Sequence, residues 1–283
     1  MSRALSKLGL ILTVAIGLAF LFLPLVMLAI HLGFAQIWQQ LQTPAAFDAL
    51  YLSVTTSIAS LAVVVLIGMP IAYLLGTSEF YGKRLIEVLL QMLIVTPTTV
   101  AGVGLLLVFG RPGLFGHWLE SVGVSISFST PAVIFAQAFI ALPFFIQAGK
   151  TAFAGVPQSL VQASRTLGAS PGRTFFKVIV PLAAPGLISG LVLSWAKALA
   201  EFGVTLMFAG NLPGKTQTLP LAIYTALETD LDLAIAMSVL LLTVSFILLL
   251  SVKLVEMMPE IRRRRRRKGV MANAHMHDDE VSA

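Results

Sequence analysis

The chain has 283 residues, of which 57% are hydrophobic and only 11% are charged, and its mean hydropathy is +0.92. A soluble domain carries about a quarter charged residues, so this composition excludes a soluble enzyme, a nucleic-acid-binding domain and a disordered scaffold. The absence of cysteine excludes disulfides and thiolate metal sites, and the meaning of the net charge of +6 depends on where the basic residues lie.

Six stretches are apolar and long enough to cross a bilayer as helices, for which about 20 residues are needed. They cover residues 8–30, 51–76, 88–109, 131–154, 182–208 and 233–252. The first stretch is longer than the apolar region of a secretory signal, which has about 7–15 residues, so we interpret it as an uncleaved helix. The sequence therefore predicts an all-α integral membrane protein with six transmembrane helices.

The basic residues indicate the orientation in the membrane. Sixteen of the 19 Lys and Arg residues fall on the side that holds both termini, namely Arg3, Lys7, Lys83, Arg84, Lys150, Arg165, Arg173, Lys177, Lys253 and the run Arg262–Lys268. Arg111 and Lys215 fall on the other side, and Lys197 lies within the fifth span. Because cytoplasmic loops are enriched in Lys and Arg, we expect both termini to be cytoplasmic.

A polar run interrupts the third span. It consists of Thr96, Pro97, Thr98 and Thr99. Proline leaves a backbone carbonyl without its helical partner, so this run either lines a path through the membrane or only kinks the helix.

The cytoplasmic loop 155–181 has the pattern of two short helices. Pro157 suits a first helical turn, and Leu160, Val161, Ser164 and Leu167 then recur on one helix face. Gly168 is placed to end this helix in a left-handed conformation. Ser170 and Pro171 predict the start of a second helix that runs to Pro181. An amphipathic helix of this kind is suited to docking in a partner's groove.

Lys197 and Glu201 are four residues apart in the fifth span. On one continuous helix they would share a face, and because charges are costly within a bilayer we expect them to pair. The pair is either a structural ion pair or part of a path in which Lys197 attracts an oxyanion.

Residues 209–216 match a relaxed phosphate-binding-loop pattern that ends in Gly214, Lys215 and Thr216. A true loop of this kind follows a strand and faces cytosolic nucleotide. This copy follows a membrane helix on the outer side, so we expect an outer loop on which a binding protein sits rather than a nucleotide site.

The C-terminal segment, 253–283, contains the basic run Arg262–Lys268, which we interpret as an anchor to anionic lipid rather than to nucleic acid. We expect the polar tail that follows to be disordered, and its His275 and His277 do not make a convincing metal site. The chain thus divides into 1–49 (the first transmembrane helix and an outer loop), 50–252 (a core with five transmembrane helices) and 253–283. Six helices are few to surround a transport path, which suggests that the chain forms a dimer.

The cytoplasmic loop 155–181 also carries a recognisable motif. It begins with Gln162, Ala163 and Ser164, has Gly168 after a gap of three residues, and ends, after a further gap of nine residues, with residues 178–181, the last of which is Pro181. It resembles the EAA loop of ABC importer permeases, in which Glu-Ala-Ala, Gly and Ile-x-Leu-Pro stand at the same spacing. In this chain Gln162 replaces the Glu and Ser164 the second Ala.

Two further stretches are similar to the molybdate branch of that family. They are residues 96–110, from Thr96 to Gly110, and residues 201–224, which include Glu201-Phe202-Gly203 and Thr218-Leu219-Pro220. Sulfate permeases are similar through the Gly-Asn-x-Pro region but differ after it.

The resemblance implies a type I ABC importer permease, a homodimer in the inner membrane of a bacterium or archaeon. It would translocate molybdate delivered by an extracytoplasmic binding protein, with ATP and Mg²⁺ held by separate cytoplasmic ATPase subunits. The implied coupling residues are Pro157, Gln162, Ala163, Ser164, Arg165, Gly168 and Pro181; path candidates are Thr96, Pro97, Thr98, Thr99, Lys197 and Glu201.

Two alternatives remain open at this point. The substrate could be sulfate or tungstate, since these dianions share charge and shape with molybdate. The chain could also be an ion-gradient-driven transporter, although Glu201 is the one acidic residue we identify in the membrane region and no proton-relay set is visible. A lipid-modifying enzyme is disfavoured because no catalytic cluster of Ser, His and Asp is apparent.

Overall fold

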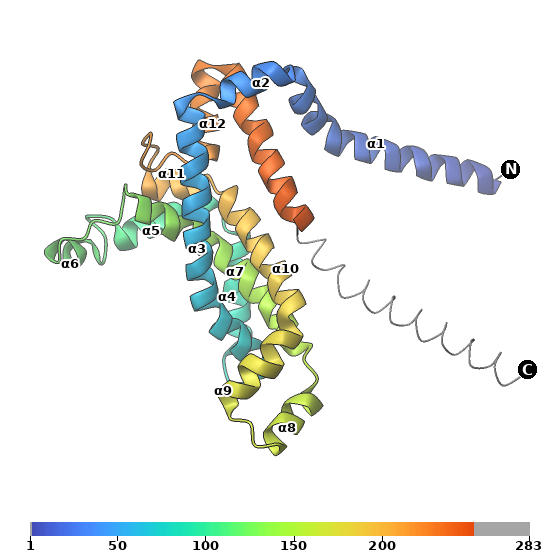
Figure 1. The fold of residues 1–283 in the computed structure, drawn as a ribbon, viewed down its shortest axis with the longest axis vertical. Helices are drawn as coiled ribbons and strands as arrows, with labels where there is room; N and C mark the ends of the chain where they lie inside the picture. The colour runs from blue at the N-terminus through green and yellow to red at the C-terminus, as the bar shows by residue number, and fades with distance from the viewer. Residues whose placement is uncertain (1, 252–283) are drawn as a thin grey trace, which may run out of the picture. The chain divides into compact units, whose positions relative to one another are not determined.

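The computed structural model describes residues 2–251, and every regular element within them is helical (Figure 1). The basic run and tail, 253–283, lie outside the described residues. The described chain forms two compact units, one of residues 2–54 with 210–244 and the other of residues 55–209 with 245–251. The all-helical prediction is confirmed for the described part of the chain.

Within residues 2–251, five helices are long and apolar enough to cross a membrane. The first is Gly9–His31, which lies within α1 (Ser2–His31). The other four are α3 (Pro44–Thr77), α7 (Thr130–Ala154), the helical stretch Pro171–Leu199 and a last helix, Leu231–Ser251. The first, second, fourth and sixth predicted spans are confirmed, whereas the fifth has different bounds. They form because uninterrupted runs of apolar residues satisfy their backbone hydrogen bonds internally, as lipid requires.

The third predicted span is not one straight helix. It is divided into α4 (Lys83–Val95) and α5 (Thr98–Phe109), which are bent by 112° relative to each other. Thr96 closes α4 by donating its N–H to the Met92 carbonyl and then takes extended backbone angles. Pro97 has no N–H to continue the ladder and disfavours a helical Thr96. The described part of the chain has up to six spans if this bent pair counts as one.

The helix that follows the predicted loop also departs from expectation. The second short helix does not end at Pro181, because α9 (Pro171–Thr174), a π-helical turn (Phe175–Ile179) and α10 (Val180–Leu199) are contiguous. The Val180 N–H donates to the Phe175 carbonyl, five residues back. This wider turn precedes Pro181, so the proline is accommodated at the start of α10 rather than terminating the helix.

The fifth span likewise ends earlier than predicted. α10 stops at Leu199, and a separate helix, α11 (Gly203–Ala209), begins three residues after Ala200. The predicted span 182–208 therefore contains a break, and residues 200–202 lie within it.

The unit of residues 2–54 and 210–244 also contains α2 (Phe34–Leu41) and α12 (Leu219–Thr229). A core of mostly small residues joins the start of α3 to α12, with Ala46, Ala49, Ala222 and Ala226 all buried. The Ser53 hydroxyl accepts a hydrogen bond from the Leu219 N–H at 2.6 Å. This bond satisfies one of the orphan donors at the start of α12.

In the other unit α7 packs along α10 through small side chains. Gly186 and Gly190 on α10 lie so close to α7 that an added Cβ would come within 2.7 Å of the Ala152 Cβ and 2.6 Å of the Ala148 Cβ. The two glycines and the two alanines are each four residues apart, which is the spacing that lets membrane helices approach closely.

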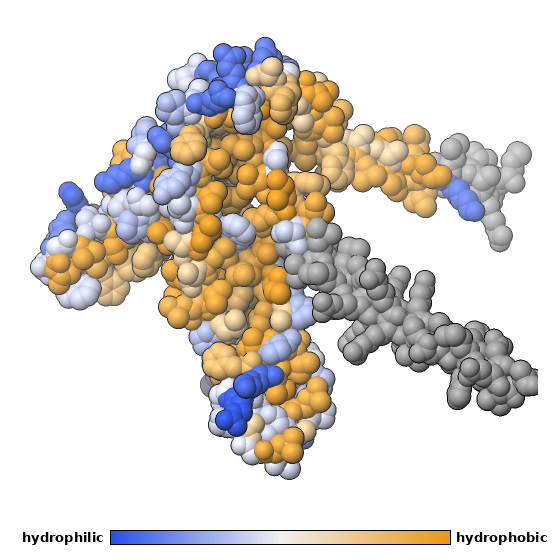
Figure 2. Space-filling model, viewed as in Figure 1, coloured by the Kyte–Doolittle hydropathy of each residue, from blue (hydrophilic) through white to orange (hydrophobic). Residues whose placement is uncertain are grey.

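The surface of this unit is largely apolar, as expected for contact with lipid. Large apolar side chains such as Leu66, Val95 and Leu193 are exposed. Figure 2 shows apolar residues over α3 and α10 and a hydrophilic patch near the end that carries α8 (Gln158–Thr166) and α9. A short helix, α6 (Gly116–Ser121), follows α5.

Candidate functional site

The predicted loop contains a helix with one buried contact. Pro157 is the residue before α8, with extended backbone angles, rather than part of its first turn. Of the predicted apolar face, only Val161 is buried, in the main core of the unit; Leu160 and Leu167 are exposed and Ser164 is half-buried. The two leucines are therefore available to a partner, whereas Val161 packs within the chain.

The predicted elbow at Gly168 is confirmed. Its φ is +81°, in the left-handed region that glycine favours. The Gly168 N–H donates to the Arg165 carbonyl at 2.9 Å, and the Ala169 N–H donates to the Ser164 carbonyl at 3.2 Å. These two bonds form the hydrogen-bond pattern with which a left-handed residue closes a helix.

The next helix begins as predicted at Ser170. The Ser170 hydroxyl accepts a hydrogen bond from the Arg173 N–H at 3.3 Å, and Pro171 occupies the first helical turn. The hydroxyls of Ser164 and Thr174 are 3.1 Å apart and hydrogen-bonded. Ser164, one of the departures from the family motif, thus connects α8 to α9.

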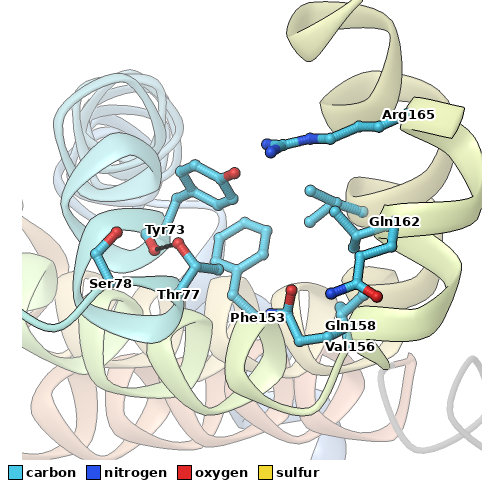
Figure 3. A pocket seen from close by; sticks show the side chains of 10 residues that line it. Tyr73, Thr77, Ser78, Phe153, Val156, Gln158, Gln162 and Arg165 are labelled. Atoms are coloured by element: carbon cyan, nitrogen blue, oxygen red, sulfur yellow. Dashed lines mark hydrogen bonds between the residues drawn. The ribbon is translucent and has the colours of Figure 1, made fainter. Parts of the chain in front are cut away.

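Gln162 and Arg165 line a cavity of about 290 Å³ between α8 and the ends of α3 and α7 (Figure 3). Its lining residues are Tyr73, Thr77, Ser78, Phe153, Val156, Gln158, Val161, Gln162, Arg165 and Ile179. The remaining coupling candidates do not line it: Ala163 is exposed on α8, Gly168 forms the elbow and Pro181 lies at the start of α10.

An aromatic cluster stiffens one wall of this cavity. The ring of Tyr73 meets Phe153 edge-on at 5.4 Å and Phe175 edge-on at 5.0 Å between centroids. Nearby, the Lys150 ammonium pairs with the Glu87 carboxylate at 2.6 Å and joins α7 to α4. Sequence reasoning missed these residues because Tyr73 and Phe153 are far apart along the chain and their types are ordinary for a membrane helix.

Lys197 and Glu201 do not pair as predicted. Glu201 lies in the break between α10 and α11, so the two residues are not on one helix face. The Glu201 carboxylate accepts a hydrogen bond from the Val204 N–H at 2.9 Å, and the Lys197 ammonium lies 5.9 Å from the centre of the Phe144 ring. Among residues 2–251 no ion pair joins Lys197 to Glu201.

The polar run of the third span lies close to this break. An added Cβ on Gly203 would collide with the Thr98 side chain, so the starts of α5 and α11 are in close contact. The Thr96 hydroxyl donates to the Met92 carbonyl at 2.7 Å, while Pro97 and Thr99 are exposed. The structure thus brings Thr98 near the segment that holds Glu201.

The phosphate-loop resemblance has the wrong structural context, because Ala209 ends α11, residues 210–216 lie between α11 and α12, and the segment follows a helix, not a strand. The Asn211 amide donates to the Thr225 hydroxyl at 2.9 Å, and the Thr216 hydroxyl accepts from the Leu212 N–H at 2.9 Å. The loop is therefore folded onto α12. No group of His, Asp or Glu residues suited to a metal occurs within residues 2–251.

Comparison with known proteins identifies similar chains. The family model described as the binding-protein-dependent transport system inner membrane component matches residues 68–257. The molybdenum transport system permease protein ModB of Mycobacterium tuberculosis is 43% identical over 238 residues, which cover 83% of this chain and 89% of that protein. The probable transport system permease protein NifC of Clostridium pasteurianum is 34% identical and covers 90% of this chain and 89% of that protein.

A solved structure has the same fold. It is a chain of a bacterial ABC transporter involved in the import of the acidic polysaccharide alginate, with a TM-score of 0.69 and 16% sequence identity, and the match covers 90% of this chain and 96% of that one.

Proposed function

The chain belongs to the family of binding-protein-dependent transport system inner membrane components, and from this premise we propose that it is the permease subunit of an ATP-driven importer of molybdate. The observation that carries this proposal is the α7–α10 loop, in which Gly168 closes α8 at the motif spacing of importer permeases. The substrate follows from the ModB relative, whose name specifies molybdenum transport.

The exposed face of α8 supports docking to an ATPase. Leu160 and Leu167 are 46% and 88% exposed, although leucine gains by burial, and they flank Gln162 and Arg165 on a helix with no acidic residue. We assign Pro157, Gln162, Ala163, Ser164, Arg165, Gly168 and Pro181 to this coupling surface. ATP and Mg²⁺ would bind to the ATPase chains, and this chain would respond to their closure.

Transport then requires the loop to move the membrane core. Val161 anchors α8 in the main core of the unit that contains α3, α7 and α10, so force applied to α8 is transmitted to those helices. Two copies of the chain would enclose the path, and Thr96, Pro97, Thr98, Thr99, Lys197 and Glu201 are the candidates for residues that border it. An extracytoplasmic binding protein would deliver the oxyanion on the side that holds residues 209–216.

The chain is a multi-pass membrane protein, and in our proposal both termini and α8 face the cytoplasm of a bacterial or archaeal cell. The absence of cysteine makes this directly testable. A single cysteine at Lys215 should react with a membrane-impermeant maleimide in right-side-out vesicles, and one at Ser159 should react only after permeabilisation. The reverse pattern would contradict the orientation.

Copurification and ATP hydrolysis test the function itself. The chain is purified from its native membrane in mild detergent, the accompanying chains are identified, and hydrolysis is measured with binding protein loaded with molybdate, tungstate or sulfate. Stimulation by the molybdate-loaded form is expected. Stimulation by sulfate alone would correct the substrate, whereas uptake that survives ATP depletion and collapses with an ionophore would indicate a gradient-driven transporter.

A further inference from the structure

The cavity beneath α8 is lined by Arg165, an exposed cation without a counter-charge among the described residues. Arg165 projects from α8 toward the side of the cavity formed by α3 (Figure 3), and its guanidinium forms no ion pair with any described residue. The two carboxylates on the segments next to this cavity are already occupied, because Glu79 pairs with Lys83 at 2.7 Å and Glu87 pairs with Lys150 at 2.6 Å.

The opposite wall supplies hydrogen-bond donors. The hydroxyl of Tyr73 points into the cavity (Figure 3) and has no hydrogen-bond partner among residues 2–251. Gln158 and Gln162, on α8, add amides to the lining, while the Thr77 hydroxyl donates to the Tyr73 carbonyl. No carboxylate lines the cavity. Hydroxyl and amide groups donate to oxyanions, and a guanidinium adds two parallel charge-assisted bonds.

The residue one helical turn before Arg165 leaves its charge uncompensated. Gln162 lies three residues before Arg165 on α8 and is uncharged. A glutamate at that distance on a helix would partly neutralise the guanidinium. With glutamine, the cavity keeps a net positive potential, which attracts anions.

We propose that this cavity binds a small cytosolic oxyanion, of the phosphate, sulfate and molybdate class, between Arg165 and the Tyr73 hydroxyl of α3. A volume of about 290 Å³ is well above the roughly 10–15 Å³ that a cavity needs to hold one water, so it leaves room for one tetrahedral anion. The bound anion would connect α8 to α3 and so restrain the loop. The statements that the anion comes from the cytosol and that it affects transport rest on the proposed function, but the binding itself does not.

Equilibrium dialysis of the purified chain in detergent tests the proposal, with radiolabelled molybdate, sulfate and phosphate as separate probes. Saturable binding of at least one probe is expected, weakened at least about tenfold in Arg165→Gln and several-fold in Tyr73→Phe. Arg173→Gln is the matched control, because Arg173 is an exposed arginine of the same loop outside the cavity lining. Lys197→Met controls for a site in the membrane region.

Three results would overturn the proposal: no saturable binding by the unaltered chain, unchanged binding in Arg165→Gln, or an equal loss in Arg173→Gln. Far-ultraviolet circular dichroism checks that each variant remains folded, and Arg165→Lys, which keeps the charge but not the planar fork, should give intermediate binding. Because the assay uses the isolated chain, a negative result leaves the proposed transport function untouched, and a failure to import molybdate leaves the anion site untouched.

Discussion

Glu201 accepts a hydrogen bond from the backbone N–H of Val204 at 2.9 Å, at the point where α10 has ended and α11 begins. The side chain is 2% exposed. Its carboxylate therefore caps α11, since a residue three positions before a free helical N–H satisfies an orphan donor and interacts favourably with the helix dipole. This role is distinct from the ion pair that a continuous helix would have produced.

The Glu201 cap predicts how substitutions of Glu201 and of Lys197 combine in their effects on the free energy of unfolding. Glu201→Gln keeps an oxygen acceptor and should lower the free energy of unfolding less than Glu201→Leu, which loses a cap worth about 1–2 kcal/mol. Because Lys197 lies over the Phe144 ring instead of on the carboxylate, the coupling energy between Lys197→Met and Glu201→Gln should stay below about 1 kcal/mol.

A double-mutant cycle by denaturant unfolding in mixed micelles measures this coupling. Removing one partner of a true buried ion pair costs about 3–5 kcal/mol, so a coupling energy of that size would show that the two residues pair in the membrane after all.

The difference between prediction and structure at this site has a simple cause. The four-residue spacing of Lys197 and Glu201 implies a shared face only if the helix is continuous, and the apolar residues on both sides of residues 200–202 give no sign of a break. Pro97 did signal a break in the third span, yet hydropathy averages over it and predicts one helix where the structure has two at 112°.

Local signals were more reliable. Glycine and serine fix backbone geometry within a turn or two, so Gly168 and Ser170 correctly marked the elbow and the next helix start. The cavity could not be predicted, because Tyr73 and Arg165 are about ninety residues apart and their proximity depends on how α3, α7 and α8 pack.

Substitutions at the Gly168 elbow should lower ATP-driven uptake to different extents. No atom lies within 4 Å of a Cβ built on Gly168, so only the backbone conformation penalises a side chain there. Gly168→Asn should retain most ATP-driven uptake, because asparagine tolerates the left-handed region, while Gly168→Ala should lose some, since the conformation costs an L-residue about 1–2 kcal/mol. Gly168→Val should abolish uptake without preventing membrane insertion.

Gly172 provides the matched control for the elbow. It also has no atom within 4 Å of an added Cβ, but its φ is not positive, so Gly172→Ala should leave uptake unchanged. Uptake of oxyanion into vesicles, normalised to the amount of inserted chain, is the measurement. Normal uptake by Gly168→Val would contradict the role of the elbow.

The contact between α7 and α10 predicts a stability difference between two glycines. A Cβ on Gly190 would lie 2.6 Å from the Ala148 Cβ, which cannot move without its backbone, whereas nothing lies within 4 Å of a Cβ on Gly104. Gly190→Ala should therefore lower the unfolding midpoint, with a cost of about 1–3 kcal/mol typical of overpacking. Gly104→Ala should leave it equal or higher. Equal midpoints in detergent would show that the two helices can separate freely.

Gln137 is a polar side chain in the core that has no hydrogen-bond partner among the described residues. It is fully buried in α7, and neither its amide nitrogen nor its carbonyl oxygen has a hydrogen-bond partner among the described residues. An unsatisfied buried polar group costs about 1–3 kcal/mol, so Gln137→Leu, similar in size, should raise the unfolding midpoint. Gln137→Ala also removes the amide but leaves a cavity, and should be less stable than Gln137→Leu.

Uptake by the same two variants separates a structural cost from a functional one. Since sequences rarely retain an unpaired buried amide without a role, we expect Gln137→Leu to be more stable and yet slower in ATP-driven uptake, as it would be if Gln137 gains its partner in another state of the transport cycle. If Gln137→Leu is both more stable and fully active, Gln137 has no such role in the transport cycle. If Gln137→Leu is less stable, the Gln137 amide has hydrogen-bond partners in the assembled protein.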